Sequence, residues 1–87
     1  MTLYNFMEVA VRNHVNSIIK EYPNVCNCQQ CKDDITAITL NNLPPKYIVR
    51  ETGEIYAKLK EMENQFDVDI IKEVTKAIKI VDDNPRH

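Results

Sequence analysis

All three cysteines of the chain lie within six residues, in the run Cys26-Asn27-Cys28-Gln29-Gln30-Cys31. A short turn can deliver two or three thiolates to one ion, and tetrahedral Zn²⁺ takes cysteine, histidine and carboxylate ligands. Residues 1–11 lack the basic start and the unbroken apolar stretch of a secretion signal, so we expect a cytoplasmic protein with reduced thiols. The spacing therefore predicts a zinc site on Cys26, Cys28 and Cys31 rather than disulfides.

Other interpretations of the cysteines stay open. Cys28 and Cys31 form a Cys-x-x-Cys pair, although no βαβ pattern surrounds them to indicate a redox site. The three cysteines could also hold an iron–sulfur cluster with a fourth from elsewhere, or be buried as small apolar residues. A zinc site with an open water position would suit a hydrolase, whereas a fully protein-ligated site is structural.

The fourth zinc ligand has two histidine candidates. His14 lies at the edge of the apolar stripe of a predicted helix, about 11 Å of helical rise before the end of that helix. A histidine at such a position is more often packed against the helix neighbours than bound to a metal. His87 follows Arg86 in a tail that is free to reach the site if the first and last helices end near each other. We therefore predict His87 as the ligand, with His14 as the alternative.

Length and charge narrow the class of protein. With 87 residues the chain corresponds to one domain with a thin core, which a metal or a partner chain would supplement. Eleven basic against 13 acidic residues leave a net charge of −2, which argues against general DNA binding. No apolar run approaches the ~20 residues of a membrane span. Because no catalytic sequence signature is present, we expect no enzyme and no catalytic residues.

The first and last segments between the prolines predict amphipathic helices. Asn5–Tyr22 carries a narrow apolar stripe, and Asn5 suits the N-cap of this helix. Glu61–Val81 carries an apolar arc of about 140° at helical spacing. A stripe of lysines lies opposite this arc and is most simply a solvated face: Lys72, Lys76 and Lys79.

The two middle segments are more ambiguous. Residues 33–43 predict a short helix, with Cys31 just ahead of it, although their β-branched residues would also suit a strand. Residues 46–58 predict a β-hairpin that turns at Gly53, and the alternative is a helix that contains Ile55 and Phe66 on one face. The fold class is thus mainly α: a small, zinc-stapled helical domain of three to four helices with a short β-hairpin.

A small set of cations and aromatic rings lies in the hairpin region: Lys46, Tyr47, Arg50 and Tyr56. Such residues can bind a phosphate-bearing ligand and stack on its bases. The simpler interpretation is a solvated hairpin with extended lysines.

The chain has more apolar helix surface than its shorter elements can cover. The residues that lie outside the main apolar arcs are Phe6, Val9, Val68 and Ile80. Uncovered apolar surface marks an interface, and a two-fold dimer is the commonest solution. We therefore predict a homodimer with helices at its centre.

Several sequence pieces, in their order along the chain, resemble the late competence development protein ComFB family of bacteria. They are Asn5-Phe6-Met7-Glu8, the cysteine run, Leu40-Asn41-Asn42-Leu43-Pro44-Pro45-Lys46-Tyr47, Gly53-Glu54-Ile55-Tyr56-Ala57, Ala77-Ile78-Lys79 and Asn84-Pro85-Arg86-His87. The resemblance implies that residues 1–87 are a single ComFB-like domain, mostly helical, non-catalytic and associated with dimers. It also implies zinc on the three cysteines.

The same resemblance bears on the fourth ligand and on function. Some relatives carry a later cysteine as fourth ligand, where this chain has His87. Some cyanobacterial relatives resemble cyclic-dinucleotide receptors. The resemblance implies a zinc-binding regulatory or adaptor protein that binds an unidentified protein partner, and the alternative is a receptor for cyclic di-GMP or cyclic di-AMP.

Overall fold

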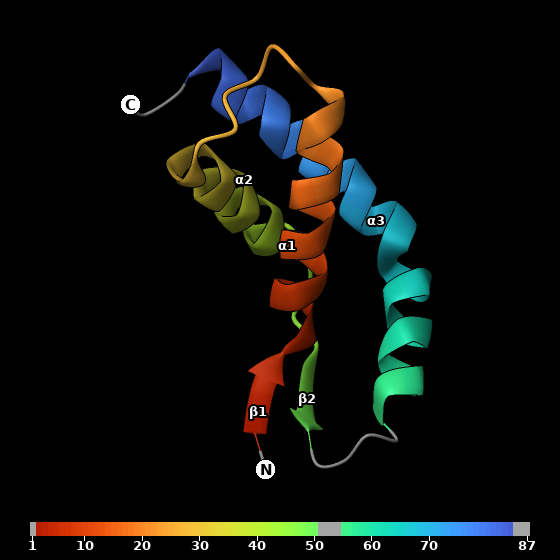
Figure 1. Cartoon of the computed structure of the whole chain (residues 1–87). Coiled ribbons are helices and arrows are strands. Elements are labelled where there is room, and N and C mark those ends of the chain that lie inside the picture. The colour runs from red at the N-terminus through yellow and green to blue at the C-terminus, as the bar shows by residue number, and fades with distance from the viewer. Residues whose placement is uncertain (1, 51–54, 85–87) are drawn as a thin grey trace.

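The computed structural model describes residues 2–50 and 55–84, and within these ranges it leaves out the side chains of 2, 50, 55–63 and 65. Its elements are β1 (Thr2–Asn5), α1 (Phe6–Ile18), a 3₁₀ turn η1 (Ile19–Glu21), α2 (Gln29–Asn41), β2 (Tyr47–Arg50) and α3 (Ile55–Asp83) (Figure 1). Each helix packs against the other two. The expected fold class, a mainly helical small domain, is confirmed.

The two strands pair with each other and not within a local hairpin. β1 runs antiparallel to β2, with Leu3 opposite Val49 and Asn5 opposite Tyr47. The expected strand at Tyr47–Val49 is confirmed, but its predicted partner is wrong because Ile55 begins α3. The predicted turn at Gly53 lies outside the described residues.

The junction between the sheet and α1 is held by Asn5. Its Oδ1 accepts hydrogen bonds from the backbone N–H of Met7 at 3.2 Å and of Lys46 at 2.8 Å. The first bond satisfies one of the N–H groups that a helix start leaves without a partner. Asn5 is therefore the N-cap, as predicted. The second bond ties the start of α1 to the chain entering β2.

Helix α2 begins four residues before the predicted start at Asp33 and ends at Asn41, ahead of Pro44. Two of its β-branched residues direct their hydroxyls to the preceding turn of the helix. Thr36 donates to the carbonyl oxygen of Lys32 at 2.7 Å, and Thr39 donates to that of Ile35 at 2.8 Å. The strand alternative for this segment is therefore wrong.

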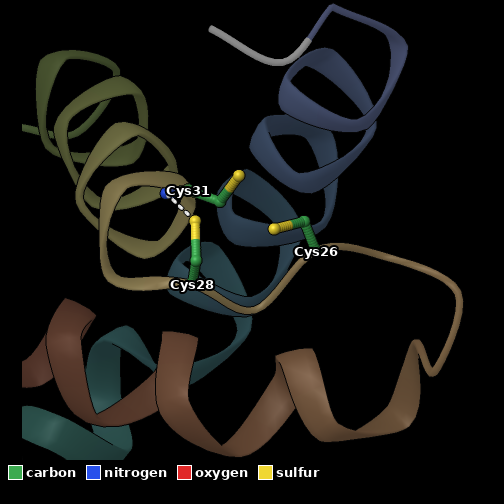
Figure 2. Close-up of side chains that lie close together, drawn as sticks. All are labelled: Cys26, Cys28 and Cys31. Carbon is green, nitrogen blue, oxygen red and sulfur yellow. Dashed lines mark hydrogen bonds between the residues drawn. The ribbon is translucent and has the colours of Figure 1, made fainter. Parts of the chain in front are cut away.

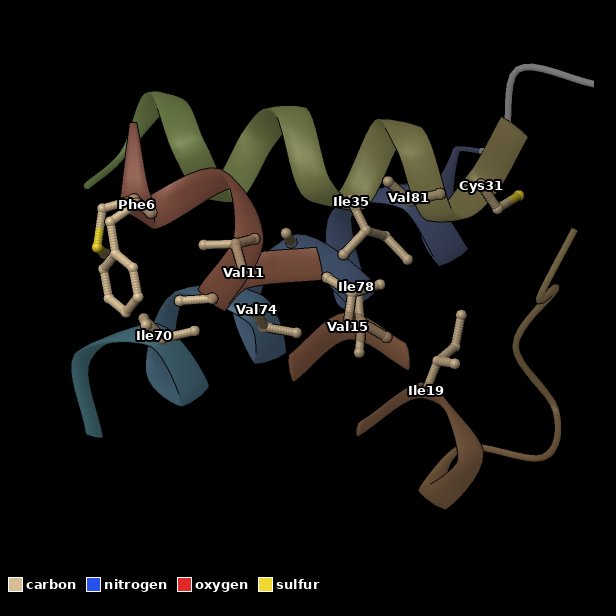
Figure 3. Close-up of a cluster of buried hydrophobic side chains, with 13 residues drawn as sticks. Phe6, Val11, Val15, Ile19, Cys31, Ile35, Ile70, Val74, Ile78 and Val81 are labelled. Carbon is tan, nitrogen blue, oxygen red and sulfur yellow. The ribbon is translucent and has the colours of Figure 1, made fainter. Parts of the chain in front are cut away.

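The core lies where the three helices meet (Figure 3). Its buried apolar side chains are Phe6, Met7, Ala10, Val11, Val15, Ile19, Cys31, Ile35, Ile70, Val74, Ala77, Ile78 and Val81. Phe6 was expected at a dimer interface and instead packs inside the chain. Val9, Val68 and Ile80 stay exposed, and the lysine stripe of α3 is exposed as predicted.

The molecule is elongated, with extents of 41 × 20 × 19 Å. The β1–β2 sheet lies at the end where α1 begins, and the loop that carries the cysteines lies where α1 ends (Figure 1). Within the part of the chain that the structure describes, no helix combines the length and the apolar content that crossing a bilayer requires.

Candidate metal centre

The cysteines lie on the loop between η1 and α2 and on the first turn of α2. Two backbone hydrogen bonds shape the start of this loop: Tyr22 N–H donates to Ile19 at 3.1 Å, and Val25 N–H donates to Tyr22 at 3.0 Å. Cys26 follows directly. The chain then enters α2, so that Cys26 comes from the loop and the other two cysteines come from the helix start (Figure 2).

Cys28 is the N-cap of α2. Its Sγ accepts a hydrogen bond from the backbone N–H of Cys31 at 3.5 Å. This hydrogen bond, together with one from the side chain of Cys26, lowers the pKa of the Cys28 thiol. The sequence predicts Cys31, in place of Cys28, just ahead of the helix. This prediction is wrong because α2 begins earlier than predicted and takes Cys31 into its first turn.

Cys31 has the opposite environment. Its side chain is buried against the core, with 1% of its surface exposed. Burial, followed by the hydrogen bonds and charges of the two neighbouring thiols, raises the pKa of Cys31 to about 12. Three thiolates this close repel one another unless a cation lies between them, and a coordinated metal ion deprotonates its thiol ligands.

The donor set fits a thiophilic metal ion. The three Sγ atoms lie within 4.8 Å of one another. Tetrahedral ligands at the Zn–S bond length are separated by about 3.8 Å, so small side-chain rotations would complete the ligand geometry. Sulfur ligands select zinc, copper(I) or iron–sulfur clusters over magnesium and calcium. Among the described residues, the group able to hold a metal is therefore Cys26, Cys28 and Cys31.

His14 lies away from these cysteines, between α1 and α3. Its Nδ1 is 2.8 Å from the carbonyl oxygen of Ala10, and its Nε2 is bonded to the carboxylate of Asp67. Both ring nitrogens are thus engaged outside the cysteine cluster. The predicted fourth ligand, His87, lies outside the described residues. No local signal reveals the His14–Asp67 contact, because its partners are 53 residues apart.

The predicted cation and aromatic set is only partly described. Lys46 and Tyr47 are exposed at the start of β2, with 64% of the Tyr47 surface accessible. The backbone of Arg50 ends β2 and that of Tyr56 lies in the first turn of α3, but their side chains lie outside the described residues.

The comparison with known protein families decides the assignment. The model of the family described as late competence development protein ComFB matches residues 4–85. The chain belongs to the ComFB family. Because the match covers the end of β1, all of β2, all three helices and the cysteine run, the ComFB resemblance expected from the sequence is confirmed over nearly the whole chain.

Two individual ComFB proteins show how far the likeness extends. The chain is 22% identical over 83 residues to the competence protein ComFB of Bacillus subtilis (strain 168), covering 95% of this chain and 85% of the relative. A solved structure described as the late competence protein ComFB from Bacillus subtilis has a TM-score of 0.78 at 21% identity. That match covers 97% of this chain and 92% of the solved chain. At this identity the structural likeness establishes the ComFB fold and no more.

Proposed function

We propose that this ComFB-family chain is a zinc-binding, non-enzymatic regulatory or adaptor protein that acts by binding a protein partner. The observation that carries the proposal is the convergence of three thiols within 4.8 Å at the start of α2. A zinc ion there would connect the loop after η1 to the helix and stabilise a thin core by several kcal/mol. Such a role is structural, and recognition would then depend on the protein surface.

We propose His87 as the fourth ligand. One support is that Val81, near the end of α3, lies close to the Cys31 end of α2 (Figure 3). Another is chain length, because the three residues from Asn84 to His87 can span up to ~10 Å. A third is that the ring nitrogens of His14 already have partners.

Elemental analysis after gel filtration tests the zinc proposal. We expect about one Zn²⁺ per chain, and we expect Cys28→Ser to lower this ratio. The alanine variants of the two histidines form a matched pair, in which His87→Ala weakens zinc retention against a chelator and His14→Ala does not. Metal-free protein with three titratable thiols and an unchanged fold would refute the proposal.

We also propose a homodimer. Residues opposite each other in the strand register share a face of the sheet, so Leu3, Val49 and Tyr47 lie on one face. Leu3 and Tyr47 expose 69% and 64% of their surfaces. Sedimentation equilibrium should give twice the chain mass. Leu3→Asp should dissociate the dimer if this face is buried in it, whereas Val68→Asp tests the exposed face of α3. A monomer at about 100 µM would contradict the proposal.

The second candidate function is a receptor for a cyclic dinucleotide. The exposed Tyr47 ring beside the exposed Lys46 supports it, because such a pair can stack on a base and contact a phosphate. Calorimetric titration with cyclic di-GMP and cyclic di-AMP tests it. A heat of binding that disappears in the Tyr47→Ala variant would support the receptor function. The absence of any heat of binding with either nucleotide would exclude it.

A further inference from the structure

A groove of about 380 Å³ lies between the loop that follows η1 and the last turns of α3. Its apolar lining comes from Tyr22, Val25 and Ile78. Ile78 is buried, and Tyr22 and Val25 are half-buried side chains packed against the core. The groove is therefore supported by well-packed residues and has the size of a small binding pocket.

Two lysines on α3 line the same groove. Lys76 and Lys79 are both exposed, and their aliphatic stems can extend the apolar walls while the ammonium groups stay in water. Among the residues that the structure describes, the lining has one carboxylate, that of Asp82, and Lys76 also lies 3.4 Å from the carboxylate of Glu73 outside the groove. Over the described part of the chain, the lining thus holds two lysines and one carboxylate around an apolar centre, and Glu73 contacts one of these lysines from outside the groove.

We propose that this groove docks an acidic segment of a partner protein. An apolar side chain of the segment would occupy the space beside Val25 and Ile78, and its neighbouring carboxylates would face Lys76 and Lys79. Charge complementarity selects an acidic partner over a basic one, since a basic segment would meet two lysines. The inference rests on the proposed function only in taking partner binding as the activity.

The metal loop forms one wall of this groove. Val25 is fixed by its hydrogen bond to Tyr22 and directly precedes Cys26. Metal held by the cysteines would therefore restrain Val25 and keep the groove open for its partner. Removing the metal should weaken docking even though no cysteine lines the groove.

Fluorescence anisotropy with a labelled peptide tests the docking proposal on the full, zinc-loaded chain. The probe is Asp-Glu-Leu-Phe-Glu-Asp, and its controls carry lysines in place of the acidic residues or glycines in place of Leu-Phe. We expect saturable binding of the acidic peptide alone. Lys79→Glu should weaken this binding at least about tenfold. The matched control Lys72→Glu, which lies on the same helix stripe and does not line the groove, should change it less than about twofold.

Two further measurements keep the outcomes distinct. Val25→Asp should abolish peptide binding, and circular dichroism confirms that the variant is folded. Zinc content is measured on every sample. If the protein holds about one zinc per chain and does not bind the peptide, the docking proposal is overturned and the zinc proposal stands. Binding that depends on Lys79 in a protein without zinc supports the groove and refutes the zinc proposal. A third outcome also overturns the proposal: the peptide does not bind, and the Lys79→Glu variant is monomeric. The occupant of the groove would then be a second copy of this chain.

Discussion

Asn5 shows how one side chain can organise the sheet end of the molecule. A single carboxamide oxygen accepts from Met7 N–H, which caps α1, and from Lys46 N–H, which orients the entry to β2. The neighbouring Phe6 N–H donates to the Lys46 carbonyl oxygen at 2.7 Å. These bonds connect segments about 40 residues apart in the sequence at the point where strand becomes helix.

Replacing Asn5 tests this double role. We expect Asn5→Ala to lower the free energy of unfolding by about 1–2 kcal/mol, because both the cap and the link to Lys46 lose their acceptor. Asn5→Asp keeps the acceptor and should cost less than half of that. Urea denaturation measures both values, and equal losses in the two variants would show that the oxygen is not the stabilising group.

The cysteines predict a pH dependence of zinc binding. At pH 7 the Cys31 thiol, whose pKa is raised to about 12, keeps its proton in the metal-free protein. Metal binding requires the thiolate, so the metal-free protein carries more protons than the metal-bound protein does. Lowering the pH therefore favours the metal-free protein. We expect the apparent zinc affinity to rise about tenfold per pH unit for each thiol proton displaced, between about pH 6 and 8.

Competition with a chromophoric chelator at several pH values measures this slope. Because the pKa of Cys28 is lowered and that of Cys31 is raised, the Cys28 thiol should lose its proton at a lower pH than the Cys31 thiol does. An affinity that stays constant across the range would mean that no thiol proton is displaced, which a site of three thiolates does not allow.

At the scale of elements, α1 and α3 are joined by core packing and, within the described side chains, by a polar contact of His14. The two ring nitrogens of His14 both face oxygen acceptors, one on Ala10 of the same helix and one on Asp67 of α3. The ring therefore connects its own helix to α3. The His14 side chain is 13% exposed, and this contact therefore lies within the helix–helix boundary.

Removing the ring should loosen this boundary and leave the metal site intact. We expect His14→Ala to cost about 1–2 kcal/mol of unfolding free energy, since both hydrogen bonds are lost from a largely buried position. Asp67→Asn keeps an acceptor oxygen and should cost less. Thermal melts monitored by circular dichroism give the ranking. Loss of zinc from His14→Ala at native conditions would instead show that His14 reaches the cysteines.

On the scale of the whole molecule, the two ends are stabilised differently. The sheet end is held by strand pairing and the Asn5 bonds, whereas the opposite end holds the cysteine loop, the first turn of α2 and the last turns of α3. Because the start of α2 carries Cys28 and Cys31, a metal there would restrain the loop end directly. The buried helix faces continue from one end to the other and couple the two ends into one core.

Metal removal tests this division. We expect chelation to lower the melting temperature, because binding to the folded state alone stabilises that state. Hydrogen exchange should accelerate at residues 22–32 and change little in β1 and β2. Cys26→Ser, which removes one ligand from the loop, should reproduce the effect without chelator. Uniform acceleration along the chain would mean that the metal stabilises the fold globally.

The sequence by itself determined the features that depend on local spacing. Three cysteines in six residues indicated one cluster, and the apolar period from Phe66 to Val81 indicated the face of α3 that packs inside. Asn5 was identifiable as a cap from its side chain and its place before an apolar stripe. The ComFB resemblance depended on short motifs in a fixed order, which a linear sequence displays directly.

Only the tertiary structure decided which distant segments meet. Thr2–Asn5 is too short to show an alternating pattern, and it becomes a strand because Tyr47–Arg50 lies beside it. Phe6 falls outside the helical stripe yet is buried, at the junction where β1 ends and α1 begins. Gln29–Lys32 is polar and becomes helical because Cys28 caps it and Cys31 reaches the core. Such pairings depend on contacts between residues far apart in the chain, and local periodicity carries no record of them.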